Sequence, residues 1–459
     1  MSLTIQAVAE ETPRWRGCGA AAPYRKSTIV EYEPFTGIQL QASQQRINRD
    51  DEIIGIPAPR AEIQNGHRPS GSFQARLYPN SLLLFLLSCG HQPVAGYPKQ
   101  GNGTNCVQTL TKGGTISGGT WTITFNGETT GAISATATAA EVQAHLERLA
   151  SVRSGDIAVT GGPVTTTNLV LTFQGNYSAK VVPDVTVTTA SLTGTTPTIT
   201  PSVTTAGATG TNLDSLGRGA APGAYIWELE ARNGALGSRG KLDAFTLSLI
   251  AAYNEQEMFG EGFAVNRLSV SGDGGVSGDM VGLYVDRFLT TPTLSPVYDS
   301  ETIRPVLFSD LKATWLSGGG PVSGFTWSVA HQHEVSDDAS IRRPDWPARC
   351  LLSGRTELTG SMESSQFDAQ DWDLMLAAGT FPLTADYVIP SMIAATGSPY
   401  RLTLYAPAAQ LGADGGPEQM QNKARHGATW PWKATYSSSS GYAHRLIVHC
   451  ARSAVETYV

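Results

Sequence analysis

The sequence predicts a mainly β protein with two similar β-sandwich or barrel modules, each with a flanking helix, and a small inserted domain of α+β or β-sandwich type. The composition is typical of a folded, turn-rich chain, because 49 of the 459 residues are glycine, 41% are hydrophobic and only 15% are charged. A strand–helix element occurs twice, 289 positions apart. Residues 107–210, which lie between the two copies, differ from their flanks in composition. A chain of this length is expected to form two to four domains.

The first copy of the repeated element is RPSGSFQARLYPNSLLLFLLSCG, from Arg68 to Gly90. Its first part alternates between polar residues and residues that suit packing, which is the period of a strand with one polar face. The polar residues are Ser70, Ser72, Gln74 and Arg76. Its second part has the spacing of a helix with one buried stripe. The stripe residues are Leu83, Leu86, Leu87 and Gly90. Pro79 suits the first turn of this helix.

The second copy lies 289 positions further on, where Gly360-Ser361 takes the place of Gly71-Ser72. The polar residues of its strand are Thr359, Ser361 and Glu363. The stripe of its helix consists of Trp372, Met375, Leu376 and Gly379. Asp368 can cap the helix and Asp371 favours its dipole. Both helices are expected to be buried and to end in a left-handed glycine.

Residues 107–210 are rich in Thr, Gly, Val and Ala and contain only nine charged residues, which indicates an insertion. WTITFN alternates like a strand, and Thr138 to Glu141 forms a capping box before a helix with Val142, Leu146 and Leu149. Further strands are expected at DIAVT, NLVLTF and DVTVT. The flanking segments GYPKQGNGTN and TAGATGTNLDSLGRGAAPGA are expected to be tethers.

Without the insertion, the lengths on either side of the two copies become similar. We therefore expect a first module at residues 1–106 and 211–295, an inserted domain at residues 107–210, and a second module at residues 296–459.

The charge of the chain disfavours tight binding of nucleic acid, because a formal net charge of −7 gives no basic face. No secretory signal is evident, and the longest apolar run, Leu82 to Leu87, is far shorter than the roughly 20 residues that span a bilayer. We expect a soluble product that is made in the cytoplasm and has no membrane partner. The five cysteines are scattered and suit buried free thiols better than metal ligands or disulfides.

Three patterns resemble binding sites, and each has a simpler structural explanation. His331-Gln-His333-Glu334 could hold a metal ion, but an exposed strand end is preferred because no third ligand is evident. The cluster SGDGGVSGDM, from Ser271 to Met280, favours a hairpin turn over a phosphate cradle. The Trp-rich segment from Ala428 to Cys450 favours a terminal β-hairpin over a surface that stacks a sugar or base.

No GxSxG elbow, P-loop or HExxH motif appears in the sequence. Glu301, Asp337 and Asp338 suit solvated loops better than the carboxylate pair of a glycan-cleaving enzyme. The chain is therefore not expected to be an enzyme, and no catalytic, cofactor-binding or metal residues are assigned.

Outside the insertion, about 350 residues resemble tail tube (major tail) proteins of long-tailed bacteriophages. The similar segments are EIIGIPAPR, GSFQARLYPNSLLLFLLSCG, FAVNRLSVSGDGGVSGDM and RCLLSGRTELTGSMESSQFDAQDWDLMLAAG. The insertion, with GTWTITFNGETTGAI and AAEVQAHLERL, resembles accessory domains of phage virion proteins. In the tail tube family, β-sandwich modules form sixfold rings that stack into a conduit for DNA ejection.

The resemblance implies a structural virion protein that is synthesised in the host cytoplasm and located in the phage tail. With two modules per chain, three chains would complete a pseudo-hexameric ring, and a hexamer is the alternative. The implied partners are neighbouring rings, a tape measure protein and a tail terminator, while DNA passes through without specific binding.

The resemblance also implies a polar and acidic lumen, with the insertion on the exterior of the tube. The candidate lumen-lining residues are Ser72, Gln74, Arg76, Ser361 and Glu363, although these strand faces could instead face outside solvent. A carbohydrate-binding adhesin or tail-fibre protein is the alternative function, because the Thr- and Gly-rich insertion and exposed aromatic residues would serve it.

Overall fold

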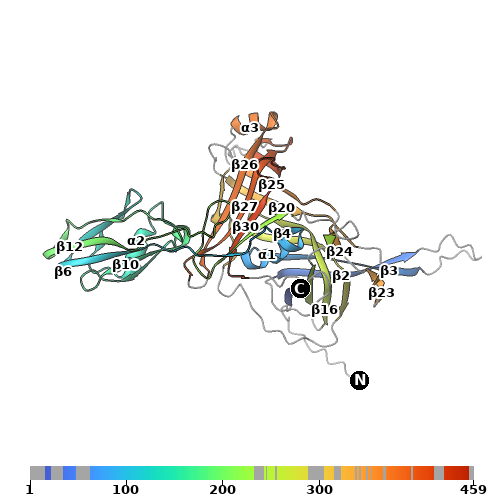
Figure 1. Ribbon diagram of the computed structural model, residues 1–459, viewed down its shortest axis with the longest axis horizontal. Coiled ribbons are helices and arrows are strands. Elements are labelled where there is room, and N and C mark those ends of the chain that lie inside the picture. Colours follow the sequence, from blue (N-terminus) through green and yellow to red (C-terminus); the bar gives the residue numbers. More distant parts are fainter. Residues whose placement is uncertain are drawn as a thin grey trace, which may run out of the picture.

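The prediction of a mainly β fold is confirmed by a computed structural model of the chain (Figure 1). The described residues are 16–21, 35–47, 62–231, 242–243, 246–253, 256–287, 304–314, 322–335, 339–340, 343–347, 350–352, 354–364, 369–393, 396–417 and 428–453. Below, "first half" means residues 1–106 and 211–295, "second half" means residues 296–459, and "insert" means residues 107–210.

A row of antiparallel strands, which we call the long row, crosses both halves. In spatial order it contains β2 (Phe35–Ile47), β3 (Ile63–Arg76), β17 (Gly275–Val281), β16 (Gln256–Val270), β20 (Val322–Ala330), β25 (Glu357–Ser364) and β29 (Ala428–Ala434). The pairing of β16 with β20, from Arg267↔Ala330 to Val270↔Trp327, joins the first half to the second. Beyond β29 lie β28 (Gly416–Pro417) and the end of β27 (Pro399–Leu411).

A second row also mixes the two halves. It contains β19 (Leu311–Thr314), β26 (Thr380–Met392), β27, β30 (Arg445–Cys450), β13 (Tyr225–Ala231), and then β4 (His91–Pro93) with β5 (Lys99–Gln100). Strand β30 pairs with β27 of its own half and with β13 of the first half.

Shorter strands surround these rows. Strands β18 (Tyr284–Arg287) and β15 (Thr246–Tyr253) pair with β16, and β1 (Arg16–Ala21) pairs with β15. Two small sheets combine β14 (Leu242–Asp243), β24 (Cys350–Leu352) and β21 (His333–Val335), and β22 (Ala339–Ser340) with β23 (Arg343–Pro347). A 3₁₀ turn, η3 (Phe308–Asp310), precedes β19.

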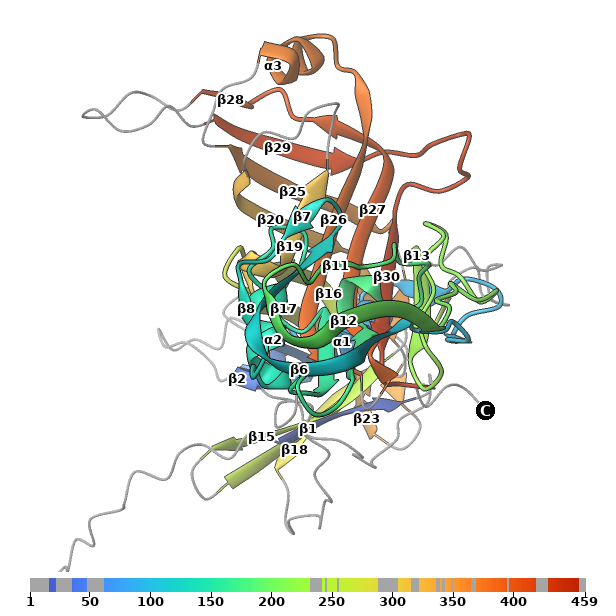
Figure 2. The same ribbon diagram turned by 90° about the vertical axis from the view of Figure 1, so that its left-hand side faces the viewer.

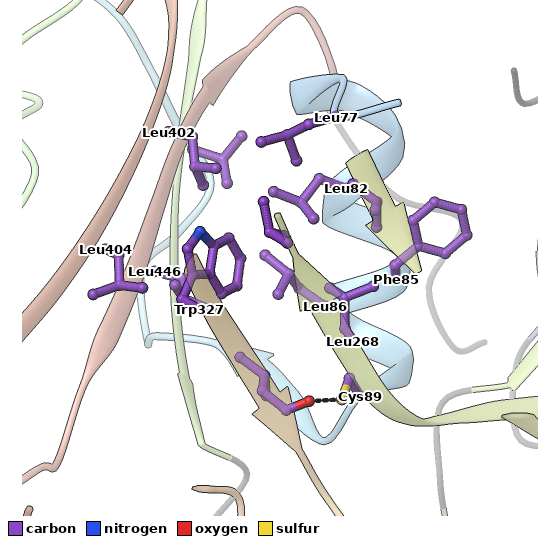
Figure 3. Packing of buried hydrophobic residues seen from close by; sticks show 14 of the residues in the cluster. Leu77, Leu82, Phe85, Leu86, Cys89, Leu268, Trp327, Leu402, Leu404 and Leu446 are labelled. Carbon is purple, nitrogen blue, oxygen red and sulfur yellow. Dashed lines mark hydrogen bonds between the residues drawn. The ribbon is translucent and has the colours of Figure 1, made fainter. Parts of the chain in front are cut away.

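Helix α1 (Pro79–Ser88) is the centre of the hydrophobic core that the halves share. All ten of its residues are buried. They pack against β16 and β4 of the first half and against β27 and β30 of the second. Figure 3 shows Leu82 and Leu86 beside Leu268, Trp327, Leu402 and Leu446. As predicted, Pro79 stands in the first turn and Gly90 follows the helix with a φ of 77°.

The repeated strands β3 and β25 occupy equivalent places in two three-strand units with the same register. In the unit β2–β3–β17, Leu40 and Met280 lie opposite Gly71. In the unit β20–β25–β29, Trp327 and Trp432 lie opposite Gly360. A Cβ on Gly71 would lie 2.7 Å from the Gln39 carbonyl oxygen, and one on Gly360 would lie 2.3 Å from the Thr326 carbonyl oxygen. Each glycine therefore allows the neighbouring strand to approach closely.

Helix α3 (Ala369–Leu376) differs from its counterpart α1. It packs on β27, but the prediction of a buried stripe is wrong, because Leu376 is 66% exposed and Trp372, Met375 and Gly379 are only partly buried. The predicted left-handed position is also wrong, because Ala378 has a φ of 49° and Gly379 follows it in another conformation. Asp371 lies in the first turn as predicted, and Asp368 lies outside the described residues.

The insert has a hydrophobic core of its own, centred on Trp121, Ile123, Leu146 and Phe173. Its elements are β6 (Val107–Phe125), β7 (Glu128–Thr129), β8 (Ile133–Ser134), α2 (Ala139–Leu146), β9 (Ile157–Gly161), β10 (Leu169–Phe173), η1 (Gly175–Tyr177), β11 (Thr186–Thr188) and β12 (Leu192–Thr205). The capping box of Thr138 and Glu141 is confirmed. In Figure 1 the insert projects to one side of the two rows.

The expected tethers are ordered segments that hold the insert in place. Their backbones bond to each other, with Gly101 N donating to Ala224 O at 2.8 Å and Thr104 bridging Ala208. The base of the insert also contacts the turn between β26 and β27, where Gly175 N donates to Gly397 O at 2.9 Å. The Ser178 and Ser398 hydroxyls lie 2.9 Å apart. The segments that flank the insert are therefore hydrogen-bonded connections and not unstructured linkers. Figure 2 shows the insert from the side facing away from the rows.

Replacing Gly360 by alanine is expected to lower the free energy of unfolding by about 1–3 kcal/mol, measured by chemical denaturation. The added methyl group would meet the Thr326 carbonyl oxygen and, at 2.5 Å, the Trp432 ring. Gly71→Ala should act in the same direction.

Gly37→Ala is the matched control, because Gly37 lies in the same row and its nearest neighbours, the Gln74 Cβ and Oε1 atoms, are 3.8 Å away. An equal loss of stability in Gly37→Ala and Gly360→Ala would contradict the close-approach explanation.

Candidate functional site

The five candidate lumen-lining residues lie on one face of the long row. Ser72, Gln74 and Arg76 project from β3, while Ser361 and Glu363 project from β25. Residues directly opposite each other in antiparallel strands share a face. One line of consecutive cross-strand pairs extends this face over six strands and consists of Gln74, Ser277, Ser269, Ser328, Thr359 and Lys433. A neighbouring line of pairs runs through Gln39, Ser72, Asp279, Arg267, Ala330 and Glu357. We call this surface the polar face.

The opposite face of the long row belongs to the shared core. Its buried residues include Phe73, Val276, Leu268, Phe325, Trp327, Met362, Trp430 and Trp432. The alternation of β3 and β25 therefore extends across all seven strands of the long row. On the polar face, hydroxyl pairs bridge neighbouring strands, with Thr326 2.8 Å from Ser361 and Ser328 3.1 Å from Thr359.

The charges on the described part of the polar face are balanced. Its basic residues are Arg68, Arg76, Arg267 and Lys433, and its acidic residues are Asp279, Glu357 and Glu363 together with Asp273 at the rim. At its rim, Arg76 lies 3.9 Å from Asp273. The Ser271 hydroxyl and the Gly275 amide donate to Asp273 and lower the pKa of this carboxyl. The face is thus polar, as expected for the lumen, but without the expected excess of acidic groups.

The polar face is hollowed. A groove of about 690 Å³ crosses β20, β25 and β29 beside the end of α3, and Arg267, Ser361, Met375, Gln410 and Lys433 are among its lining residues. A second groove, of about 460 Å³, follows β3 and β17 between Gln74 and Ser277. Both grooves are open, so the face suits a broad, wetted surface better than a closed ligand pocket.

Several residues of the polar face were not predicted from the sequence. Arg267, Ser269 and Asp279 stand in the alternating segments NRLSV and VSGDM, which signal strands. The alternation does not say which strands they join. Their place between β3 and β20 depends on pairings that link residues up to about 200 positions apart in the sequence.

The other candidate sites have structural roles. The prediction that His331 and His333 mark an exposed strand end is wrong, because both side chains are buried. Within the described part of the chain, no group of three or more His, Cys, Asp or Glu side chains is placed to hold a metal ion. Residues Ser271 to Gly274 form a hairpin turn between β16 and β17, as predicted, and Gly275 to Met280 are part of β17. Glu301, Asp337 and Asp338 lie outside the described residues.

The Trp-rich segment also contributes to the core. Trp430 and Trp432 are buried in the long row and cannot stack on a ligand, whereas Tyr436 in the following loop is 69% exposed. The described cysteines Cys89, Cys106, Cys350 and Cys450 are buried free thiols, as predicted. Burial raises the pKa of the Cys89 thiol to about 12, which makes it a poor nucleophile. Among the described residues, no helix has the length and apolar character needed to cross a membrane.

No protein-family model matches the sequence, and no curated protein matches it significantly.

Proposed function

We propose that this chain is a structural subunit of a phage-type tail tube, in which the polar face lines the lumen through which DNA is ejected. The observation that carries the proposal is the continuity of the polar face from β3 to β29 through both halves. A conduit needs a wetted surface that does not hold its cargo. Scattered hydroxyls, amides and balanced charges supply such a surface, since they offer no basic patch to bind phosphates.

The two equivalent three-strand units support a ring of three chains. Each chain carries both units in one register, joined through β16. Three chains then present six units around one lumen. In such a ring, the exposed residue Leu376 on α3 packs against the first half of the next chain, just as α1 is covered by strands of the other half within one chain. Neighbouring rings, a tape measure protein and a tail terminator are the further partners of this proposal.

Electron microscopy of the purified chain tests the symmetry. We expect rings or stacked tubes whose averaged density has threefold symmetry, with three projecting inserts per ring. Sixfold density with six inserts would replace the trimer by a hexamer. A monodisperse particle that never forms rings would overturn the tube and favour the adhesin alternative.

Substituting Leu376 by aspartate tests the contact between chains. We expect ring assembly to be lost, with sedimentation at the single-chain value, because a buried unpaired charge costs several kcal/mol. The thermal stability of the unassembled chain should hardly change, since the side chain is exposed there. Val181→Asp is the matched control, because Val181 is 82% exposed but lies on the insert. Equal assembly of both variants would rule out α3 as a contact.

Replacing residues 107–205 by a short Gly-Ser linker tests the place of the insert. Because the insert has a separate core, the rest of the chain is expected to fold and to form rings of unchanged inner diameter. Circular dichroism of the shortened chain verifies folding independently of assembly. Folded chains that fail to form rings would show that the insert is part of the ring wall.

A further inference from the structure

A cluster of buried histidines lies where the two halves meet. His91 follows α1 in the first half, and His444 precedes β30 in the second half. Their Nε2 atoms are 3.0 Å apart, and both side chains are 2% exposed. The His91 Nδ1 atom lies 3.2 Å from the Leu86 carbonyl oxygen, which can only accept a hydrogen bond. Nδ1 of His91 therefore carries the proton, and His444 donates from Nε2 to Nε2 of His91. Both rings are neutral in this arrangement.

A second pair of imidazoles continues this junction. His331 Nδ1 lies 2.9 Å from the Thr356 hydroxyl, which in turn donates to the Gly90 carbonyl oxygen at 3.3 Å. Because the Thr356 hydroxyl donates its proton to the Gly90 carbonyl oxygen, His331 Nδ1 is the donor in its hydrogen bond with Thr356. The contact with Gly90 is close, because a Cβ on this glycine would lie 2.7 Å from the His331 ring.

His333 also forms a hydrogen bond to a residue of the first half. Its Nδ1 atom lies 3.1 Å from Asn266 Oδ1, at β16. The Nε2 atoms of His331 and His333 are buried and have no hydrogen-bond partner. A proton added at either atom would be a buried charge without a counter-charge in contact.

The charged and titratable groups around the cluster do not compensate for added protons. The cleft beside His331 and His444 is lined by Glu230 at the end of β13, Arg355 and Glu357 at β25, Lys433 on β29, and Tyr436 and Tyr442 in the loop before β30. Glu357 pairs with Arg355 at 2.7 Å, and Glu230 lies 4.0 Å from Arg445 of β30. On the side of α1, the thiol of Cys89 is neutral, because burial raises its pKa.

We propose that this histidine cluster is an acid-sensitive lock between the halves, which opens the junction of α1 with β30 on protonation while the insert stays folded. Burial lowers the pKa of His331 and of His444 to about 4 and that of His333 to about 3, against an ordinary value of 6.5. Burial, followed by the neighbouring His444, also lowers the pKa of His91. Below pH 6.5 the histidines therefore bind more protons when the junction is open than when it is closed. The stabilisation is complete above pH 6.5 and declines as the pH falls toward 4.

Hydrogen exchange of the unassembled chain at pH 7.5 and pH 5.0, corrected for the intrinsic pH dependence of exchange, tests the lock. We expect the protection of peptides from α1 and β30 to fall at pH 5.0 by roughly 30-fold for each histidine that takes up a proton on opening. Peptides from β6 and β10 of the insert are the internal control and should keep their protection. Unchanged protection at the junction, or an equal loss in the insert, would overturn the proposal.

Two variants assign the effect to the cluster. His444→Gln keeps a donor toward His91 but cannot titrate, so the acid-induced loss at the junction should shrink by about 30-fold. His145→Gln removes a histidine of the insert and should leave that loss unchanged. An identical pH response in both variants would exclude His444. If His444→Gln does not fold, the comparison of junction and insert peptides in the unmodified chain still decides the proposal.

Discussion

The structure depends on the need to cover α1 on every side. Five leucines and one phenylalanine of this helix are buried, and full burial of each such side chain is worth about 1.5–3 kcal/mol. Their sum is comparable with the whole stability of a typical domain, about 5–15 kcal/mol. Two polar residues of the helix are hydrogen-bonded inside the core, since Ser88 accepts from the Val265 amide and Asn80 from the Ala451 amide, whereas the buried Ser81 hydroxyl has no partner among the described residues. Neither half covers the helix alone, so the two halves form one core.

Local features of the sequence were sufficient to predict the elements that need no distant partner. The alternation around Ser72 and Ser361, the capping box at Thr138 and the left-handed Gly90 each follow from a few neighbouring residues. The equivalent register of the two units places Gly71 and Gly360 at the same position, and their spacing of 289 residues is visible in the sequence. The burial of His331 and the exposure of Leu376 could not be predicted, because both depend on how strands that are remote in sequence pack together. An apolar stripe predicts that one face of a helix is buried, but it does not identify the element that packs against this face.

Buried charges fix the base of the insert to the second half. Arg218, in the segment that returns from the insert, lies 2.8 Å from Asp214 and 2.9 Å from Asp386 of β26. Burial alone would raise the pKa of Asp214, but hydrogen bonding to His449 and the charge of Arg218 hold it below its usual value. Removing one member of such a buried network leaves an uncompensated charge, which is strongly destabilising. The network therefore specifies one orientation of the returning segment.

The position of the insert also explains why a chain with two similar units carries one insert. Along the first half, the repeated strand and helix are followed by β4, β5, the insert and β13; along the second half, they are followed by β26, a short turn and β27. The insert thus occupies the place of the β26–β27 turn, and its own base is hydrogen-bonded to that turn through Gly397 and Ser398. A second insert at this turn would displace the contacts that hold the first. In the proposed ring, fusion of two units makes every second joint intramolecular, which lowers the entropic cost of closing the ring. Because units with an insert alternate with units without one around this ring, its symmetry is threefold and not sixfold.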